Sequence, residues 1–157
     1  MKKKLTAAVF ILLPLILGFA VSVPIDIEAK YALLQKPPLA PPALVFPIVW
    51  SVLYILLGVG SYLAYSSARE KGVKTASVLT PYIIGLIFNL LWSPVFFGAG
   101  MFLTGAFISV LIIVFLVWTI KAFKTVNSTA AYLQIPYLAW SVFASYLSFG
   151  IYCLNLQ

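Results

Sequence analysis

Long apolar runs that contain no charged side chain occupy most of this chain. Each run has about 19–24 residues, enough for a helix to cross a hydrocarbon core of about 30 Å. A backbone in lipid has to satisfy its own hydrogen bonds, and the runs lack the alternation typical of strands, so we predict helices. We therefore expect an all-α integral membrane protein, a five-transmembrane-helix bundle that forms a single membrane domain over residues 1–157. The predicted helices cover residues 5–23, 43–66, 79–97, 101–120 and 130–153.

The charged residues indicate how the chain is oriented. Only 8% of the residues are charged, whereas a soluble domain has about 25%. The net charge of +7 comes from basic residues in short clusters between the apolar runs, a pattern typical of membrane orientation rather than of nucleic-acid binding. Lys30 and Lys36 fall on one side of the membrane, and the N-terminus is predicted to lie inside and the C-terminus outside. The basic residues on the inner side are Lys2, Lys3, Lys4, Arg69, Lys71, Lys74, Lys121 and Lys124.

The first apolar run, 5–23, has a second interpretation. Three lysines, an apolar stretch and the sequence Ala20-Val21-Ser22 together resemble a cleaved signal peptide. We favour a retained helix, because the run is long enough to span the membrane and its removal would leave four helices.

Aromatic stripes mark one face of three predicted helices, since residues on a helix advance by about 100° each. Asn89 is the strongly polar member of these faces and lies well inside its helix. It either forms a hydrogen bond between helices or orients a ligand in an aromatic-lined cavity. The faces comprise Phe46, Trp50, Tyr54, Gly58, Ser61 and Tyr65; Tyr82, Gly85, Asn89, Trp92, Ser93 and Phe96; and Pro136, Tyr137, Trp140, Phe143, Ala144 and Leu147.

Small side chains recur inside the predicted helices, among them Gly18, Gly58, Gly60 and Gly105. Such residues let membrane helices approach closely, within one protomer or between two. They predict packing rather than function.

Several chemistries lack the residues that they need. The chain has no histidine, and its acidic residues, Asp26, Glu28 and Glu70, all fall between the apolar runs. This argues against proton-coupled transport, nucleophilic catalysis and a metal site. We expect no cofactor. The chemistry that remains is recognition of a flat or apolar molecule by aromatic side chains.

The connection over residues 24–42 contains the sequence LQKPPLAPP, from Leu34 to Pro42. Prolines restrict their own backbone and that of the preceding residue, so we predict a stiff, extended segment. Such a segment costs little to order over a ligand and therefore suits a lid. It also suits a turn into the helix that follows.

Three segments of the chain resemble the tryptophan-rich sensory protein family, also called the translocator protein, peripheral benzodiazepine receptor or TspO/MBR family. The resemblance runs from Tyr31 to about Asn155 and indicates a bacterial member. The segments are KPPLAPPALVFPIVWSVLYILLGVGSYL, NLLWSPVFFGAG and PYLAWSVFASYL.

The resemblance implies a protein of the bacterial cytoplasmic membrane, usually a homodimer, whose pocket opens toward the 24–42 connection. Family members bind porphyrins such as protoporphyrin IX, benzodiazepine-type ligands and sterols. Lys36 could then meet a porphyrin carboxylate. The pocket residues implied by the resemblance are Tyr31, Pro41, Trp50, Tyr54, Asn89, Trp92, Trp140 and Ala144.

The resemblance leaves the activity open. The first hypothesis is a binding or sensory protein that takes up a porphyrin or a similar ligand. The alternatives are light- and oxygen-dependent porphyrin breakdown, with Trp50 and Trp140 as the candidate catalytic residues, transport of the ligand, and a scaffold with an incidental pocket. Two positions depart from the family pattern, Leu39 and Lys30, where aromatic residues are common. Residues 148–153 lack the basic residue of the family's sterol motif.

Overall fold

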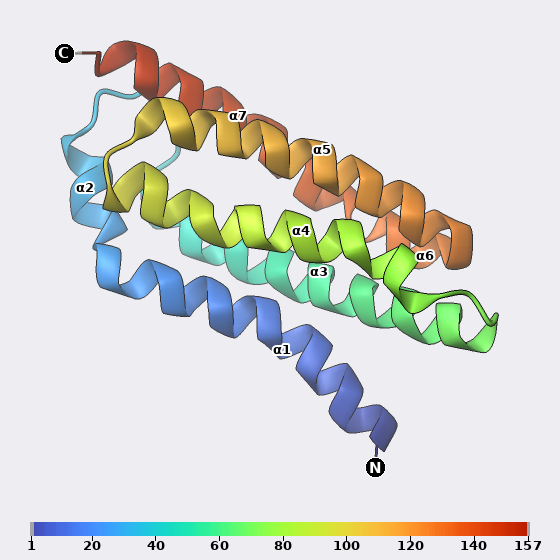
Figure 1. Ribbon diagram of the computed structural model, residues 1–157. Helices are drawn as coiled ribbons and strands as arrows, with labels where there is room; N and C mark the ends of the chain where they lie inside the picture. Colours follow the sequence, from blue (N-terminus) through green and yellow to red (C-terminus); the bar gives the residue numbers. More distant parts are fainter. Residues whose placement is uncertain (1, 157) are drawn as a thin grey trace.

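Five long helices make up most of the computed structural model, which describes residues 2–156. They confirm the predicted all-α membrane fold, because each is apolar and long enough to cross a membrane. In Figure 1 they run along the length of one elongated body, and the two ends of the chain lie at opposite ends of it. Two short helices lie between them. The helices are α1 (Lys2–Ser22), α2 (Ile27–Leu33), α3 (Val45–Glu70), α4 (Thr75–Ser93), α5 (Phe102–Val126), α6 (Ser128–Tyr132) and α7 (Ile135–Leu154).

The helices differ from the sequence expectation in three ways. The fifth predicted helix, 130–153, is divided by a turn at residues 133 and 134 into α6 and α7. α3 and α5 continue past their apolar runs to Glu70 and Val126, because a helix has no need to stop where the hydrocarbon core ends. The third predicted helix, 79–97, ends in a different geometry. Ser93 is the last α-helical residue, and Pro94–Gly98 form a π-helical turn, since the Pro94 ring has no N–H for the helical ladder.

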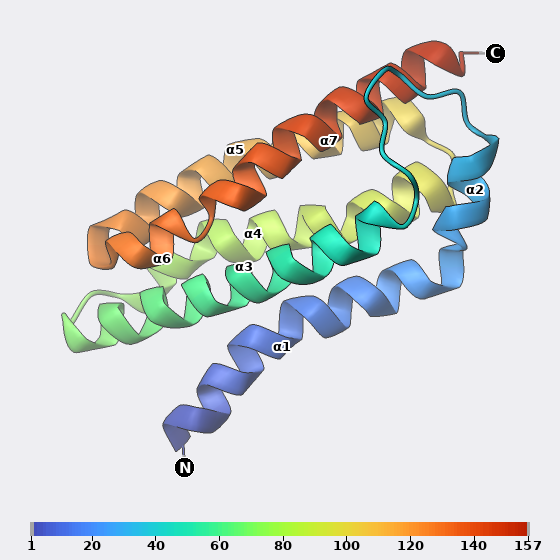
Figure 2. The same ribbon diagram turned by 180° about the vertical axis from the view of Figure 1, so that it is seen from behind.

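α1 joins the rest of the bundle along a glycine seam. A Cβ atom at Gly58 would lie 2.6 Å from the Cα of Ile11 and 2.6 Å from the carbonyl oxygen of Phe10. A Cβ at Gly18 would meet the ring of Tyr54. The prediction that small residues allow close helix approach is confirmed at both positions. Figures 1 and 2 show the N-terminal part of α1 diverging from the other helices, so the seam is its main attachment.

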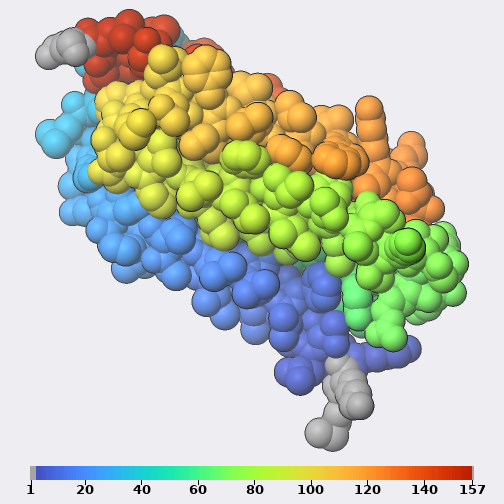
Figure 3. All heavy atoms as spheres, viewed as in Figure 1, coloured from blue at the N-terminus to red at the C-terminus, as the bar shows by residue number. Residues whose placement is uncertain are grey.

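The end of the bundle that carries most of the basic residues is fastened by polar contacts. Lys71 donates to the carbonyl oxygen of Val126 at 2.6 Å, at the end of α5. Asn127 accepts from the Ala130 amide and caps α6, while its Nδ2 donates to Ser67 Oγ at 2.9 Å. Figure 3 shows this end opposite the one that holds the C-terminal residues. These bonds fix α5, α6 and α3 relative to one another.

The other end of the bundle contains α2, a helix inside the 24–42 connection that the sequence pattern does not predict. Asp26 begins this helix, and its carboxylate accepts from the Ala29 amide at 3.3 Å. Lys30 joins α2 to the π-helical turn after α4 through Nζ, which donates to the carbonyl oxygens of Phe97 at 2.8 Å and Gly98 at 3.1 Å. α2 therefore has a fixed position beside the π-helical turn.

The proline-rich segment, residues 34–42, lies across α7 as a strap (Figure 2). The backbone of Gln35 pairs with the Asn155 side chain through two hydrogen bonds, of 3.0 and 2.9 Å. Tyr146 donates to the carbonyl oxygen of Pro38 at 2.9 Å. Pro37 is buried against Gly150, where a Cβ would come within 2.6 Å of its ring. The segment is thus bound along its length to α7.

The expected extended conformation of this segment is interrupted by one turn. Ala40 donates to the carbonyl oxygen of Pro37 at 3.3 Å, and Leu39 has a left-handed φ of 68°. The four turn residues are 37–40, with Pro38 at the second position and the positive φ of Leu39 at the third, which is the pattern of a type II turn. Leucine carries a steric cost in that conformation, which glycine or asparagine would avoid.

Replacing Asn155 by alanine is expected to loosen the strap without unfolding the bundle. Each lost hydrogen bond costs about 1 kcal/mol, so the Gln35 amide should exchange with deuterium about fivefold faster or more. Hydrogen exchange with mass spectrometry measures this, and Asn127→Ala serves as a control at the other end. An unchanged Gln35 exchange rate would show that Asn155 does not hold the strap in solution.

Candidate functional site

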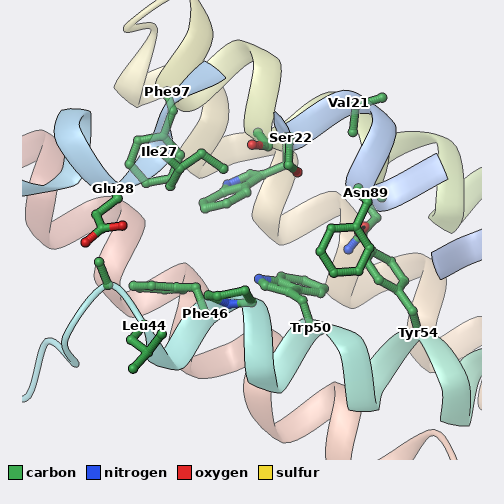
Figure 4. Close-up of a pocket in the computed structure, with 16 residues that line it drawn as sticks. Val21, Ser22, Ile27, Glu28, Leu44, Phe46, Trp50, Tyr54, Asn89 and Phe97 are labelled. Carbon is green, nitrogen blue, oxygen red and sulfur yellow. Dashed lines mark hydrogen bonds between the residues drawn. The ribbon is translucent and has the colours of Figure 1, made fainter. Parts of the chain in front are cut away.

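A cavity of about 210 Å³ lies at the α2 end of the bundle, among α1, α2, α3 and α4. Its wall is apolar and aromatic for most of its extent. Figure 4 shows the labelled side chains around it, with Glu28 and Asn89 at opposite ends and Phe46 and Trp50 between them. The lining residues are Gly18, Phe19, Val21, Ser22, Ile27, Glu28, Ala43, Leu44, Phe46, Pro47, Trp50, Tyr54, Asn89, Trp92, Ser93 and Phe97.

Aromatic contacts hold the main wall of the cavity in place. The ring centroid of Trp50 lies 5.5 Å from that of Tyr54, one turn further along α3, and 5.9 Å from that of Tyr137 on α7. On the facing side, the ring of Trp92 lies 5.6 Å from Phe97, at a right angle to it. Edge-to-face and offset pairs of this kind are favourable. The indoles at positions 50 and 92 therefore form fixed walls.

Asn89 forms the centre of a buried hydrogen-bond network at the inner end of the cavity. Tyr54 donates to its Oδ1 at 2.5 Å, and its Nδ2 donates to the hydroxyl of Tyr137 at 2.6 Å. The network joins α3, α4 and α7, as the interpretation of Asn89 as an interhelical hydrogen-bonding residue predicts. Asn89 also lines the cavity, and its amide has one further N–H and one further lone pair. Its role in orienting a ligand stays a prediction.

Two other polar groups in the wall are buried without a partner among the described residues. They are Nε1 of Trp92 and Oγ of Ser93. Ser93 is only 7% exposed, so water does not readily compensate its hydroxyl. Leaving a buried donor unpaired costs about 1–3 kcal/mol. Both residues line the cavity, so a ligand acceptor that reaches either group would recover that cost.

The eight residues implied by the family resemblance are not all brought together. Trp50, Tyr54, Asn89 and Trp92 line the cavity. Tyr31 and Ala144 lie beside a separate narrow void of about 10 Å³. This void lies behind the wall, because Phe46, Trp92 and Phe97 line both spaces. The ring centroid of Tyr31 lies 5.1 Å from that of Phe46.

Pro41 and Trp140 also lie outside the group of lining residues. Pro41 accepts a hydrogen bond from the Tyr31 hydroxyl at 2.9 Å, and burial raises the pKa of this phenol, so the hydroxyl remains a donor well above neutral pH. The ring centroid of Trp140 lies 6.1 Å from that of Phe46. Trp140 therefore supports the wall from α7, and the expectation that α7 supplies lining residues differs from the geometry.

The structure also adds residues that the sequence analysis did not assign to the site. α1 contributes Gly18 and Ser22, and α2 contributes Glu28. The strap prolines do not line the cavity within the described chain; the cover comes from α2 and from Ala43 and Leu44. The one sequence signal that could have indicated Glu28 is its place in the same connection as the LQKPPLAPP segment.

The fold and the cavity define a helical membrane protein with five spans and an aromatic cavity at one end. The chain belongs to the TspO/MBR family, whose model matches residues 10–154. It is 39% identical over 156 residues to a tryptophan-rich protein TspO of Chlorobaculum tepidum, with 98% of each chain covered.

Two further relatives extend the comparison. A tryptophan-rich sensory protein of Cereibacter sphaeroides is 36% identical over 125 residues, which is 80% of this chain and 76% of the relative. A translocator protein of Ovis aries is 36% identical over 130 residues, with 78% of this chain and 72% of the relative covered. The family therefore spans bacteria and animals at similar identity.

Proposed function

We propose that this protein binds a flat apolar ligand, a porphyrin such as protoporphyrin IX or a similar aromatic molecule, in the cavity among α1, α2, α3 and α4. The observation that carries the proposal is the pair of indoles, Trp50 and Trp92, in the wall of one apolar cavity. Flat π-systems gain from stacking on such walls beyond the area that they bury. The family resemblance supports the same ligand class.

The size of the cavity limits how such a ligand enters. An apolar cavity of about 150 Å³ holds benzene, and drug-sized ligands occupy pockets of about 300–1,000 Å³. At about 210 Å³, the cavity takes one or two fused rings, or one edge of a tetrapyrrole, as it stands. A whole porphyrin requires α1 or α2 to move outward, and Figures 1 and 2 show that the N-terminal part of α1 diverges from the other helices.

Replacing Trp50 by alanine is expected to weaken ligand binding by up to about tenfold, since loss of a stacked aromatic partner costs about 0.5–1.5 kcal/mol. The measurement is quenching of tryptophan fluorescence by protoporphyrin IX, titrated in the dark. Trp118→Ala is the matched control, because this tryptophan is 49% exposed on α5 and does not line the cavity. Equal affinities of both variants and the wild type would contradict the proposed site.

The same titration under light tests the enzymatic alternative. Trp50 lines the cavity, whereas Trp140 lies behind it, so a tryptophan-dependent breakdown of porphyrin would depend on Trp50 and not on Trp140. Loss of porphyrin absorbance in the wild type and in Trp140→Phe, but not in Trp50→Phe, would support breakdown. Stable absorbance in all three supports binding alone.

The proposal also covers the orientation of the protein in the membrane and its oligomeric state. We propose that the protein lies in the bacterial cytoplasmic membrane with its N-terminus inside, its C-terminus outside and the cavity at the outer end, and that it forms a homodimer. The clustering of basic residues at the opposite end supports this orientation.

A further inference from the structure

The strap, residues 34–42, crosses α7 before the end of that helix. The ring of Pro37 lies against Gly150, where an added Cβ would come within 2.6 Å of it. The hydroxyl of Tyr146 donates to the carbonyl oxygen of Pro38. Because Leu154 is the last residue of α7, these contacts lie roughly 6–12 Å before its end. Figure 2 shows the strap crossing α7 there and then running to the start of α3.

The level of the membrane boundary follows from α5, which packs beside α7. α5 contains no charged residue from Phe102 to Ile120, a run of roughly 28 Å, so a hydrocarbon core of about 30 Å requires all of it. The boundary of the core at the α2 end therefore lies near Phe102. On α7, the ring centroid of Phe149 lies 6.1 Å from that of Phe107, which is roughly 7 Å to the core side of Phe102. The strap contacts α7 beside Phe149 and so lies at or just inside this boundary.

The backbone of the strap is suited to a place where water is scarce. A backbone that faces lipid must have its polar groups paired, and the prolines at positions 37, 38, 41 and 42 have no N–H to pair. The carbonyl oxygens of all four prolines accept hydrogen bonds from the protein. The donors are, in chain order, the Ala40 amide, the Tyr146 hydroxyl, the Tyr31 hydroxyl and the Val45 amide.

Leu39 projects from the strap with 84% of its surface exposed. Its φ of 68° is a conformation that leucine adopts only at a steric cost. In water, an exposed leucine side chain would do nothing to offset this cost, and glycine would avoid it. Among acyl chains, the same side chain gains the free energy of leaving water. Contact with lipid therefore accounts for a leucine at this position.

The charge on the strap is held at the end of the bundle. Lys36 Nζ donates to the carbonyl oxygens of Leu34 at 2.9 Å and Ala32 at 3.4 Å. Both acceptors belong to the C-terminal end of α2, which lies at the end of the molecule in Figure 2. The stem can thus follow the strap while the ammonium stays in water. Lys36 does not line the cavity, so this geometry does not support its expected contact with a porphyrin carboxylate.

We propose that the strap rests in the bilayer at the boundary between headgroups and acyl chains, with the Leu39 side chain among the acyl chains. The partner is the lipid surface itself, and the contact does not depend on a ligand in the cavity. Ala43 and Leu44 follow the strap directly and line the cavity. The lipid contact therefore extends to the edge of the candidate site.

Electron paramagnetic resonance of a nitroxide at position 39 tests the proposal. Leu39→Cys is made in the full-length protein that also carries Cys153→Ser, then labelled and reconstituted into phosphatidylcholine bilayers. Collisions with molecular oxygen, which concentrates among acyl chains, are compared with collisions with a water-soluble nickel chelate. Val114→Cys on α5 is the lipid reference, and Val73→Cys in the connection between α3 and α4 is the water reference. These valines are 54% and 39% exposed, so neither substitution disturbs the core.

We expect the oxygen-to-nickel collision ratio at position 39 to lie near that at position 114 and to exceed that at position 73 severalfold. A ratio near that at position 73 would place Leu39 in water and overturn the proposal. Low collision rates with both reagents would place it against protein, as in a contact with a second copy of the chain, and would also overturn it. None of these outcomes bears on ligand binding, which the titration with protoporphyrin IX measures separately.

Discussion

Replacing Gly58 by valine is expected to separate α1 from α3 and to lower the unfolding temperature of the detergent-solubilised protein. The added Cβ would lie 2.6 Å from backbone atoms of Phe10 and Ile11, and a backbone cannot rotate out of the way as a side chain does. Overpacking of this kind costs about 1–3 kcal/mol, and valine should cost more than alanine at this position. Thermal unfolding followed by circular dichroism measures the effect.

The same substitution should abolish ligand binding, because α1 forms one wall of the cavity through Gly18 and Ser22. Gly98→Ala is the control, since a Cβ there lies no closer than 3.9 Å to its neighbours. Wild-type stability and affinity in Gly58→Val would mean that α1 does not pack on α3 at this seam.

Replacing Asn89 by leucine should destabilise the bundle by about 2 kcal/mol or more, because it leaves the buried hydroxyls of Tyr54 and Tyr137 without their partner. Changing those tyrosines to phenylalanine in the same protein removes the unpaired groups, so the triple variant should recover most of the stability. Denaturant unfolding of the single and triple variants provides the comparison. Equal losses in both would contradict a shared network.

The triple variant also separates the two roles of Asn89. If Asn89 orients the ligand, the triple variant should regain stability without regaining affinity in the fluorescence titration. Recovery of both would restrict Asn89 to joining α3, α4 and α7.

The spans and half of the implied site could be predicted from the sequence because they depend on local patterns. Apolar runs give the helices, and the faces of α3 and α4 place Trp50, Tyr54, Asn89 and Trp92 on surfaces that meet. A helical face does not reveal which neighbour it packs against, however. Trp140 lies on the expected face of α7, yet that face backs Phe46 instead of the cavity.

The missed features depend on contacts between distant parts of the chain. α1 is apolar on all sides, so no stripe in its sequence could identify Gly18 and Ser22 as lining residues. Glu28 lies in a connection without periodicity. The sequence of the proline segment predicts a lid, but it does not show which residue the segment binds. That residue is Asn155, at the C-terminal end of α7.

The strap has a consequence for the biosynthesis of the chain. Its hydrogen bonds join residues 120 positions apart, so residue 35 emerges from the ribosome long before residue 155 exists. During that interval Gln35 has no native partner, so the strap can be fastened only after α7 has been made. A fusion placed directly after residue 157 keeps Asn155 near a bulky appendage at that step, whereas one at the opposite terminus leaves it free.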